Sequence, residues 1–239
     1  MKLKVIDSGF QAGKYNMDYD MHLVENVTPD EFILRFYRWQ PYCISLGANQ
    51  KEEDINTNKL YSDGFELVRR PTGGRAVFHA EELTYSFVCY INNYSPMSLY
   101  AKINSALLAG LSLYDNRCTG LELERIQPDL NQHYKTPEGV ACFSTPAKSE
   151  VKFGGKKVIG SAQKKIGDKI LQHGSILTGD FHKKIVDYLN LPEVKKLQVE
   201  KIIQSQTLTI KDITGEEVDF DKLKKSIIEG FKKEFAINE

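Results

Sequence analysis

The chain has 239 residues, of which 41% are hydrophobic, and its 32 lysines and arginines are balanced by 32 aspartates and glutamates. This length and composition predict one domain over residues 1–239, and the balanced charge excludes the basic excess typical of nucleic-acid-binding proteins. The four cysteines show no C-x-x-C spacing, and the five histidines form no ligand pair, so neither a bound metal nor a disulfide framework is expected. No long apolar stretch is present, which favours a cytoplasmic protein with no membrane partner.

Alternating and β-branched runs predict strands in the first half of the chain, and apolar repeats near 3.6 residues predict helices. The predicted strands are residues 2–6, 32–39, 42–46, 65–69, 76–79 and 83–91, and the predicted helices are residues 16–27, 51–60 and 95–114. Because only Gln40-Pro41 and the residues beside it separate the second strand from the third, these two are expected to form a hairpin.

The second half begins with a polar connection over residues 131–139, which leads into a loop over residues 140–146. Strand-like runs at 150–153, 156–165 and 169–177 are joined at Gly154-Gly155 and Gly167-Asp168, which predicts a three-stranded meander. Amphipathic helices are predicted over residues 180–189 and 220–235, with a short meander between them.

Cys142 in the loop Val140 to Pro146 precedes Lys157 by fifteen residues. A free thiol is only slightly ionised at neutral pH, and a nearby ammonium favours the reactive thiolate. The pair therefore suggests a nucleophile with its own cation. The alternative is a small buried apolar cysteine, which is the commoner role of a lone cysteine.

An arginine–glycine loop, residues 69–75, lies between two predicted strands and is followed by a histidine. Its glycines let the backbone turn sharply and approach a ligand, and its arginines offer guanidinium groups to a phosphate, a phosphopantetheine or a carboxylate. A plain β-turn with solvated arginines is the alternative. The candidate substrate-binding residues here are Arg69, Arg70, Thr72, Gly73, Gly74, Arg75 and His79.

Small residues recur on two neighbouring strands of the predicted meander, at Gly160-Ser161-Ala162 and at His173-Gly174. Small residues weaken a strand, so their presence indicates the close approach of a ligand or of another backbone. His173 is a candidate hydrogen-bond donor or proton carrier, although a lone strand histidine is often structural. Seven lysines against two acids between residues 148 and 169 add a local positive charge that would attract an acidic carrier protein or a nucleotide.

Three segments together resemble the LipM-type octanoyltransferases of the biotin/lipoate A/B protein ligase superfamily. They are RRPTGGRAVFHAEELTYSFV at 69–88, ACFSTP at 141–146 and GGKKVIGSAQKKIGDKILQHGSIL at 154–177. The resemblance implies an α/β fold with a mixed, largely antiparallel sheet flanked by helices. It also implies that Cys142 carries the acyl group as a thioester and that Lys157 lowers the pKa of its thiol, with Lys156 as the alternative match for the family lysine.

The same resemblance implies an octanoyltransferase of lipoate biosynthesis, acting on a lipoyl-domain protein such as the glycine cleavage H protein. Acyl carrier protein would donate the octanoyl group, and no cofactor would be required. Two related activities remain open, an ATP- and Mg-dependent lipoate-protein ligase and a lipoyl-protein amidotransferase. Arg75, where ligases commonly carry a small residue, favours the transferase. The chain departs from the family at residues 144–149, which lack the usual acidic and aromatic residues.

Overall fold

The computed structural model describes residues 1–92, 94–124 and 150–237. Its largest sheet has five strands in the order β1 (Lys2–Gln11), β2 (Glu31–Trp39), β6 (Glu82–Tyr90), β11 (Lys169–Leu177) and β10 (Ile159–Ile166). Strands β1 and β2 are parallel, and each other neighbouring pair is antiparallel. The prediction of a mixed, largely antiparallel sheet is therefore confirmed.

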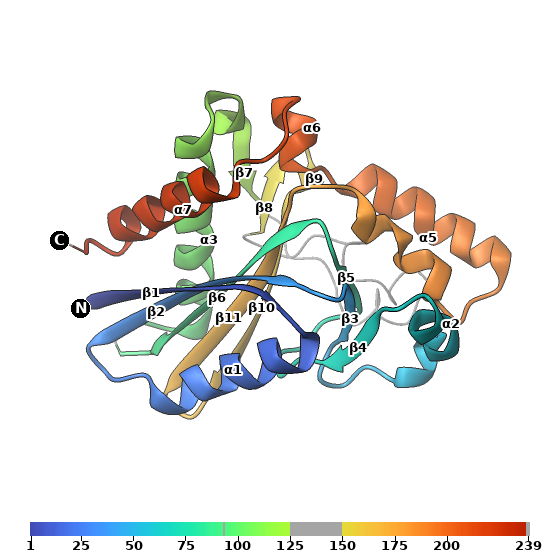
Figure 1. Ribbon diagram of the computed structural model, residues 1–239. Helices are drawn as coiled ribbons and strands as arrows, with labels where there is room; N and C mark the ends of the chain where they lie inside the picture. The colour runs from blue at the N-terminus through green and yellow to red at the C-terminus, as the bar shows by residue number, and fades with distance from the viewer. Residues whose placement is uncertain (93, 125–149, 238–239) are drawn as a thin grey trace.

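Helices cover both faces of this sheet (Figure 1). Helix α1 (Gly13–Asn26) connects the parallel strands and packs Leu23 and Val24 against Val88 and Leu171. The opposite face carries α3 (Pro96–Tyr114) and α7 (Phe220–Glu234). Successive strand residues point to opposite faces, so both faces of the central strands must be apolar.

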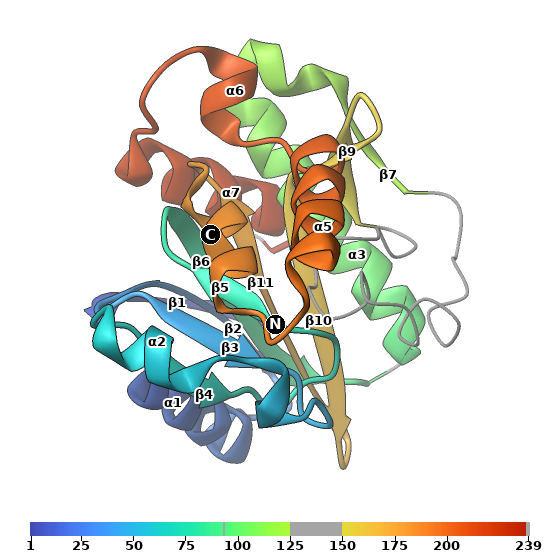
Figure 2. The same ribbon diagram turned by 90° about the vertical axis from the view of Figure 1, so that its right-hand side faces the viewer.

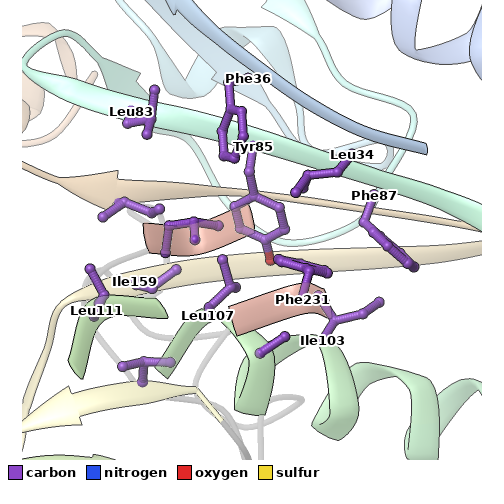
Figure 3. Close-up of a cluster of buried hydrophobic side chains, with 14 of the residues drawn as sticks. Leu34, Phe36, Leu83, Tyr85, Phe87, Ile103, Leu107, Leu111, Ile159 and Phe231 are labelled. Carbon is purple, nitrogen blue, oxygen red and sulfur yellow. The ribbon is translucent and has the colours of Figure 1, made fainter. Parts of the chain in front are cut away.

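The core between the sheet, α3 and α7 is the larger of the two apolar layers. Figure 3 shows Phe87 of β6 facing Phe231 of α7, and their ring centroids lie 5.1 Å apart. Gly110 of α3 allows α7 to approach closely, because a Cβ at this position would lie 2.6 Å from the Cα of Ile227. Ser95 caps α3 by accepting a hydrogen bond from the backbone N–H of Ser98. These contacts fix α3 and α7 as one layer.

A second sheet has the order β4 (Glu66–Arg69), β3 (Cys43–Leu46) and β5 (Val77–His79). The elements around it are the 3₁₀ helices Glu52–Asp54 and Phe181–Tyr188, α2 (Thr57–Ser62) and α5 (Glu193–Gln206). A third sheet has the order β7 (Leu121–Leu123), β8 (Val151–Phe153) and β9 (Lys156–Lys157). The 3₁₀ helix Asn116–Gly120 precedes β7, and the short helix α6 (Ile210–Thr214) precedes α7. Figure 2 shows α5 beside β9.

The predicted hairpin of residues 32–39 and 42–46 is wrong. Both edges of β2 are taken, by β1 and β6, so β3 pairs with β4 and β5 in a different sheet. The predicted three-stranded meander is also wrong as a single sheet. Val158 divides it. Its N–H donates to the carbonyl of Val151 in the third sheet, called the small sheet below, and its carbonyl accepts from the N–H of Leu177 in the five-stranded sheet. Strand β9 therefore stays with β8, while β10 joins β11.

The segment after residue 189 is helical and not a meander. Helix α5 buries Val199 and Ile203, which are spaced i, i+4 on one face, against the second sheet's core. The predicted helix over 180–189 is a 3₁₀ helix at Phe181–Tyr188. Within the described residues, no helix is both long enough and apolar enough to cross a membrane.

Candidate functional site

A pocket opens where the large sheet meets the second sheet and the arginine–glycine loop. Seven of the predicted site residues line it: Arg70, His79, Gly160, Ser161, Ala162, His173 and Gly174. Seven further residues complete the wall: Met17, Tyr37, Trp39, Ser45, Val77, Thr84 and Ser175. The wall thus combines an apolar part from α1 and β2 with a ring of hydroxyl and imidazole groups, the composition of a site that binds an apolar group and orients its polar end.

His79 is held in one orientation on three sides. Its Nδ1 lies 2.8 Å from Glu82 Oε1, its Nε2 lies 2.7 Å from Ser45 Oγ, and its ring stacks on Trp39 with centroids 4.0 Å apart. An ionised Glu82 carboxylate can only accept, so Nδ1 donates to it; on the other side of the ring, Ser45 Oγ also accepts from Arg70 Nη1 at 3.0 Å. The network therefore places the ring proton on Nδ1, where it is donated to Glu82.

His173 is held by a second buried carboxylate. Its Nδ1 lies 3.2 Å from Asp20 Oδ2, and its Nε2 lies 2.7 Å from Thr72 Oγ1. Arg35 donates to Asp20 Oδ1 at 2.8 Å, with both side chains fully buried, and Tyr37 donates to Oδ2 at 3.1 Å. Both pocket histidines thus share one design, a ring fixed between a buried carboxylate and a hydroxyl.

Burial and hydrogen bonding set the charge of these groups. Burial lowers the pKa of His173, although Asp20 acts in the opposite direction. Burial alone would raise the pKa of Asp20, but His173 and Arg35 lower it overall. The pKa of Glu82 is lowered in the same way against the effect of its burial, chiefly by His79. The two carboxylates therefore remain ionised in the interior.

The arginine–glycine loop braces itself through its own arginines. Arg69 Nη1 donates to the carbonyls of Gly47 and Gln50, and Arg70 donates to the carbonyls of Ser45, Gly73 and Arg75. Gly47 packs against this loop so closely that a Cβ on it would lie 2.0 Å from the carbonyl oxygen of Gly74. Arg70 is thus the loop residue that belongs to the pocket wall. The other loop residues predicted for the site shape the loop from outside the wall: Arg69, Thr72, Gly73, Gly74 and Arg75.

The small residues of β10 and β11 allow two backbones to approach each other. A Cβ on Gly174 would lie 2.4 Å from the carbonyl oxygen of Gly160, on the paired strand. Of the two explanations for these small residues, close approach of another backbone holds at Gly174. Ser161 adds a polar group to the wall, since its Oγ lies 2.8 Å from the hydroxyl of Tyr85 and donates to Asn104 Oδ1 at 3.0 Å.

Lys157 lies on β9 with its side chain 3% exposed, and its Nζ lies 2.8 Å from Glu150 Oε2. The predicted nucleophile Cys142 lies outside the described residues. The other three cysteines are buried, and their burial raises the pKa of Cys43 well above its usual range, that of Cys89 to about 12 and that of Cys118 to about 11. These three thiols are therefore poor candidates for a thiolate nucleophile at neutral pH.

Three of the six described lysines between residues 150 and 169 are paired or engaged within the fold. Lys152 is paired with Glu124, Lys157 is paired with Glu150, and Lys169 donates to the carbonyls of Val24 and Glu25. Lys164 and Lys165 are exposed. The local positive charge counted from the sequence thus overstates what this part of the surface presents to an acidic partner.

Sequence reasoning missed the two buried acids and most of the apolar wall. The signal for Asp20 is helical spacing: Asn16 and Asp20 are one turn apart on the face that also carries Leu23 and Val24. Trp39, the single tryptophan, ends a strand beside the pocket and donates from Nε1 to Thr84 Oγ1 at 2.7 Å. No comparable signal marks Glu82, because its partners come from β5, β6 and β11.

Relatives in sequence are similar over almost the entire chain. The octanoyltransferase LipM of Staphylococcus aureus is 33% identical over 238 residues, which cover 95% of this chain and 85% of that protein. The octanoyltransferase LipM of Clostridioides difficile is 35% identical over 214 residues, covering 85% and 75% respectively. The expectation of an acyltransferase agrees with the names of these relatives.

Solved structures share the fold. A bipartite lipoate protein ligase from Thermoplasma acidophilum superposes with a TM-score of 0.78 at 22% identity, over 100% of this chain and 85% of that one. A lipoate-protein ligase A bound with ATP gives a TM-score of 0.76 at 21% identity, over 99% and 86%. The lipoyl protein ligase A/B catalytic domain model matches residues 12–232. The chain therefore belongs to the lipoyl protein ligase A/B catalytic domain family.

Proposed function

We propose that this chain is an octanoyltransferase that moves octanoyl from acyl carrier protein to a lysine of a lipoyl-domain protein, such as the glycine cleavage H protein. The observation that carries the proposal is its similarity to octanoyltransferases, with 33% identity along 95% of the chain. The fold also resembles the bipartite ligase studied together with its E2 lipoyl domain. That resemblance supports a lipoyl-domain acceptor.

The proposed reaction has two steps through Cys142. The thiolate of Cys142 attacks the carbonyl carbon of the octanoyl thioester, the bond to the phosphopantetheine sulfur breaks, and that sulfur takes up a proton. The ε-amine of the acceptor lysine then attacks the acyl-enzyme. The amide C–N bond forms, the bond to the Cys142 sulfur breaks, and the amine loses a proton. Because the acyl group arrives as a thioester, forming the amide is downhill and the reaction needs no ATP.

Lys157 is the proposed cation for the thiolate. An ammonium beside a thiol favours its ionised form, and the same charge stabilises the oxyanion of the tetrahedral intermediate. The raised thiol pKa values of Cys43, Cys89 and Cys118 support the assignment to Cys142, because none of these thiols is suited to attack at neutral pH.

The pocket is the proposed acyl site. Met17, Tyr37, Trp39 and Val77 give its wall the apolar character that suits a short alkyl chain. The remaining wall is polar and rigid, since His79 and His173 are each fixed between a carboxylate and a hydroxyl. An acyl chain placed among the apolar residues would bring its carbonyl end toward this polar ring.

Intact-protein mass spectrometry tests the proposal. Wild type and Cys142→Ala are incubated with octanoyl-acyl carrier protein, and separately with ATP and lipoate. We expect a hydroxylamine-labile octanoyl adduct on wild type only, formed without ATP. Cys43→Ser is the matched control, because it removes a buried thiol and is expected to leave the adduct intact.

Two other outcomes would redirect the assignment. A protein that stays unacylated, while Cys142→Ala still modifies a lipoyl domain given ATP and lipoate, would be a ligase. An adduct that forms from octanoylated H protein but not from octanoyl-acyl carrier protein would identify an amidotransferase. The acceptor is then established by adding apo-H protein to the isolated acyl-enzyme and following transfer of the octanoyl mass.

A further inference from the structure

A tight hairpin brings a buried acid against Lys157. Strands β8 and β9 pair with Lys152 opposite Lys157, and the turn between them contains Gly154 and Gly155 at φ +54° and +81°. These values favour glycine, so the sequence Gly-Gly fixes the turn. The turn therefore brings Glu150, one residue before β8, beside β9. Its Oε2 lies 2.8 Å from Lys157 Nζ.

The pair is removed from water on both sides. Each side chain is 3% exposed. An ammonium buried without a counter-charge tends to lose its proton, because desolvation disfavours the charged form. A carboxylate at contact distance opposes this loss and fixes the direction in which the long, flexible lysine side chain extends. The ion pair thus holds the Lys157 Nζ at a defined place out of contact with bulk water.

The backbone of Lys157 is anchored independently of its side chain. Its carbonyl accepts from the N–H of Leu208, and residue 157 forms a parallel bridge with Thr207 at the end of α5. The N–H of Val158 is donated to Val151. With the Cα fixed in this way, the remaining freedom of Lys157 lies in its side chain, and the ion pair with Glu150 restrains the ammonium.

Glu150 also acts on Tyr85, which contacts the pocket residue Ser161. Burial raises the pKa of Tyr85, and the negative charge of Glu150 adds to the rise, while Ser161 and Gln172 oppose it. The hydroxyl of Tyr85 lies 2.8 Å from Ser161 Oγ, and Ser161 lines the pocket. Glu150 is therefore within electrostatic reach of a hydroxyl that contacts the proposed acyl site.

We propose that Glu150 is the positioning residue of Lys157, holding its ammonium charged and correctly directed for acyl transfer. This role rests on the proposed function, because only that proposal gives Lys157 a part in acyl transfer. Glu150 itself is assigned no direct contact with the reacting atoms. In the proposed role, Glu150 affects the reaction through Lys157. Replacing Glu150 should therefore slow acylation only when Lys157 is present.

A double-mutant cycle tests this dependence, with the initial rate of octanoyl-enzyme formation from octanoyl-acyl carrier protein as the readout. The variants are Glu150→Gln, Lys157→Met and the double substitution, with Glu150→Asp as the conservative change. We expect Glu150→Gln to slow acylation about tenfold or more in the wild-type background and less than about twofold beside Lys157→Met. Glu150→Asp should recover part of the rate, because it keeps the charge.

Glu124→Gln is the matched control. It removes the carboxylate of the neighbouring pair, Glu124–Lys152, on the same small sheet. We expect it to leave the acylation rate within about twofold of wild type. Thermal unfolding separates rate from stability. Glu150→Gln should lower the unfolding midpoint because it removes a carboxylate that pairs with a buried ammonium, and the double variant should recover much of that loss.

The outcomes separate the two proposals. A wild-type protein that forms no octanoyl-enzyme contradicts the proposed function, and the role of Glu150 falls with it. An acylated wild type with a Glu150→Gln rate equal to that of Glu124→Gln overturns the positioning role alone. So does an equal loss in the presence and absence of Lys157, because that result would make Glu150 an independent structural residue.

Discussion

Thr72 and His173 are joined by a 2.7 Å hydrogen bond between Oγ1 and Nε2, although 101 residues separate them. The bond fastens the arginine–glycine loop to the centre of the large sheet. Because Nδ1 of the same ring faces Asp20, the proton on Nδ1 leaves Nε2 as the acceptor for the threonine hydroxyl. This hydroxyl thus ties the loop to the large sheet, in addition to the hydrogen bonds that Arg69 and Arg70 make.

Replacing this hydroxyl is expected to weaken both the fold and the site. Thr72→Val leaves a buried ring nitrogen without its donor, and such a loss costs about 1–3 kcal/mol. Urea unfolding measures this cost, and the rate of acyl-enzyme formation should fall with it. Thr72→Ser keeps the hydroxyl and should stay close to wild type. An equal effect of the two substitutions would point to the methyl group instead of the hydrogen bond.

Stability is expected to fall as the pH decreases from about 6.5 to about 4, partly because of His182. Burial lowers the pKa of His182 from 6.5 to about 4. Between these pH values the imidazole binds a proton in the unfolded chain but not in the folded chain. The contribution is about 3 kcal/mol across the window. His173, with a lowered pKa, acts in the same direction.

The difference between variants isolates His182. The free energy of unfolding, measured in urea at several pH values, should depend less on pH in His182→Gln than in wild type. His22→Gln changes an exposed histidine and should preserve the wild-type slope. Parallel curves for wild type and His182→Gln would refute this account.

Met17 is expected to influence the acyl chain length, if the pocket holds the acyl group. It contributes an unbranched side chain from α1 to the apolar wall. Met17→Ala adds space and should favour decanoyl over octanoyl donors by about tenfold, in line with the effect of one or two methylenes in an apolar pocket. Met17→Phe should shift the preference the other way.

The ratio of kcat/KM for the two donors measures this preference. Met21→Ala is the control, because it truncates the same residue type one turn along α1, outside this pocket. An unchanged ratio in both Met17 variants would place the acyl chain elsewhere.

Gly174→Ala is expected to separate β10 from β11. The added Cβ would lie 2.4 Å from the carbonyl oxygen of Gly160, a contact that only backbone movement can relieve. Overpacking of this kind costs about 1–3 kcal/mol. Gly73→Ala is the control, since a Cβ there meets no atom within 4 Å. Thermal unfolding compares the two, and equal midpoints would contradict the close packing.

Local patterns predicted the elements better than their partners. The helix at residues 95–114 and the strand at residues 83–91 match α3 and β6, because period and capping are local properties. The pairing of β2 with β3 was wrong, since strand partners depend on which sheet edges are already occupied. Val158 shows the same limit, because its N–H and carbonyl serve two different sheets.

Only some residues of the candidate site could be predicted from local sequence patterns. Glycine, histidine and arginine patterns located Arg70, His79 and His173, whose residue types suggest chemistry. The acids that hold the two histidines, Asp20 and Glu82, look like ordinary surface charges in the sequence. No local pattern marks Glu150 either, because only the hairpin turn brings this acid to Lys157.

The bond between Asp20 and His173 joins residues 153 apart, and Thr72 adds a third distant segment to the same ring. No contiguous fragment shorter than about two thirds of the chain contains all three, so the pocket forms only once these distant segments have come together. A molecule that binds there therefore stabilises every segment together. A shift in the unfolding midpoint on adding an acyl compound would accordingly report occupancy of the pocket without any assay of turnover.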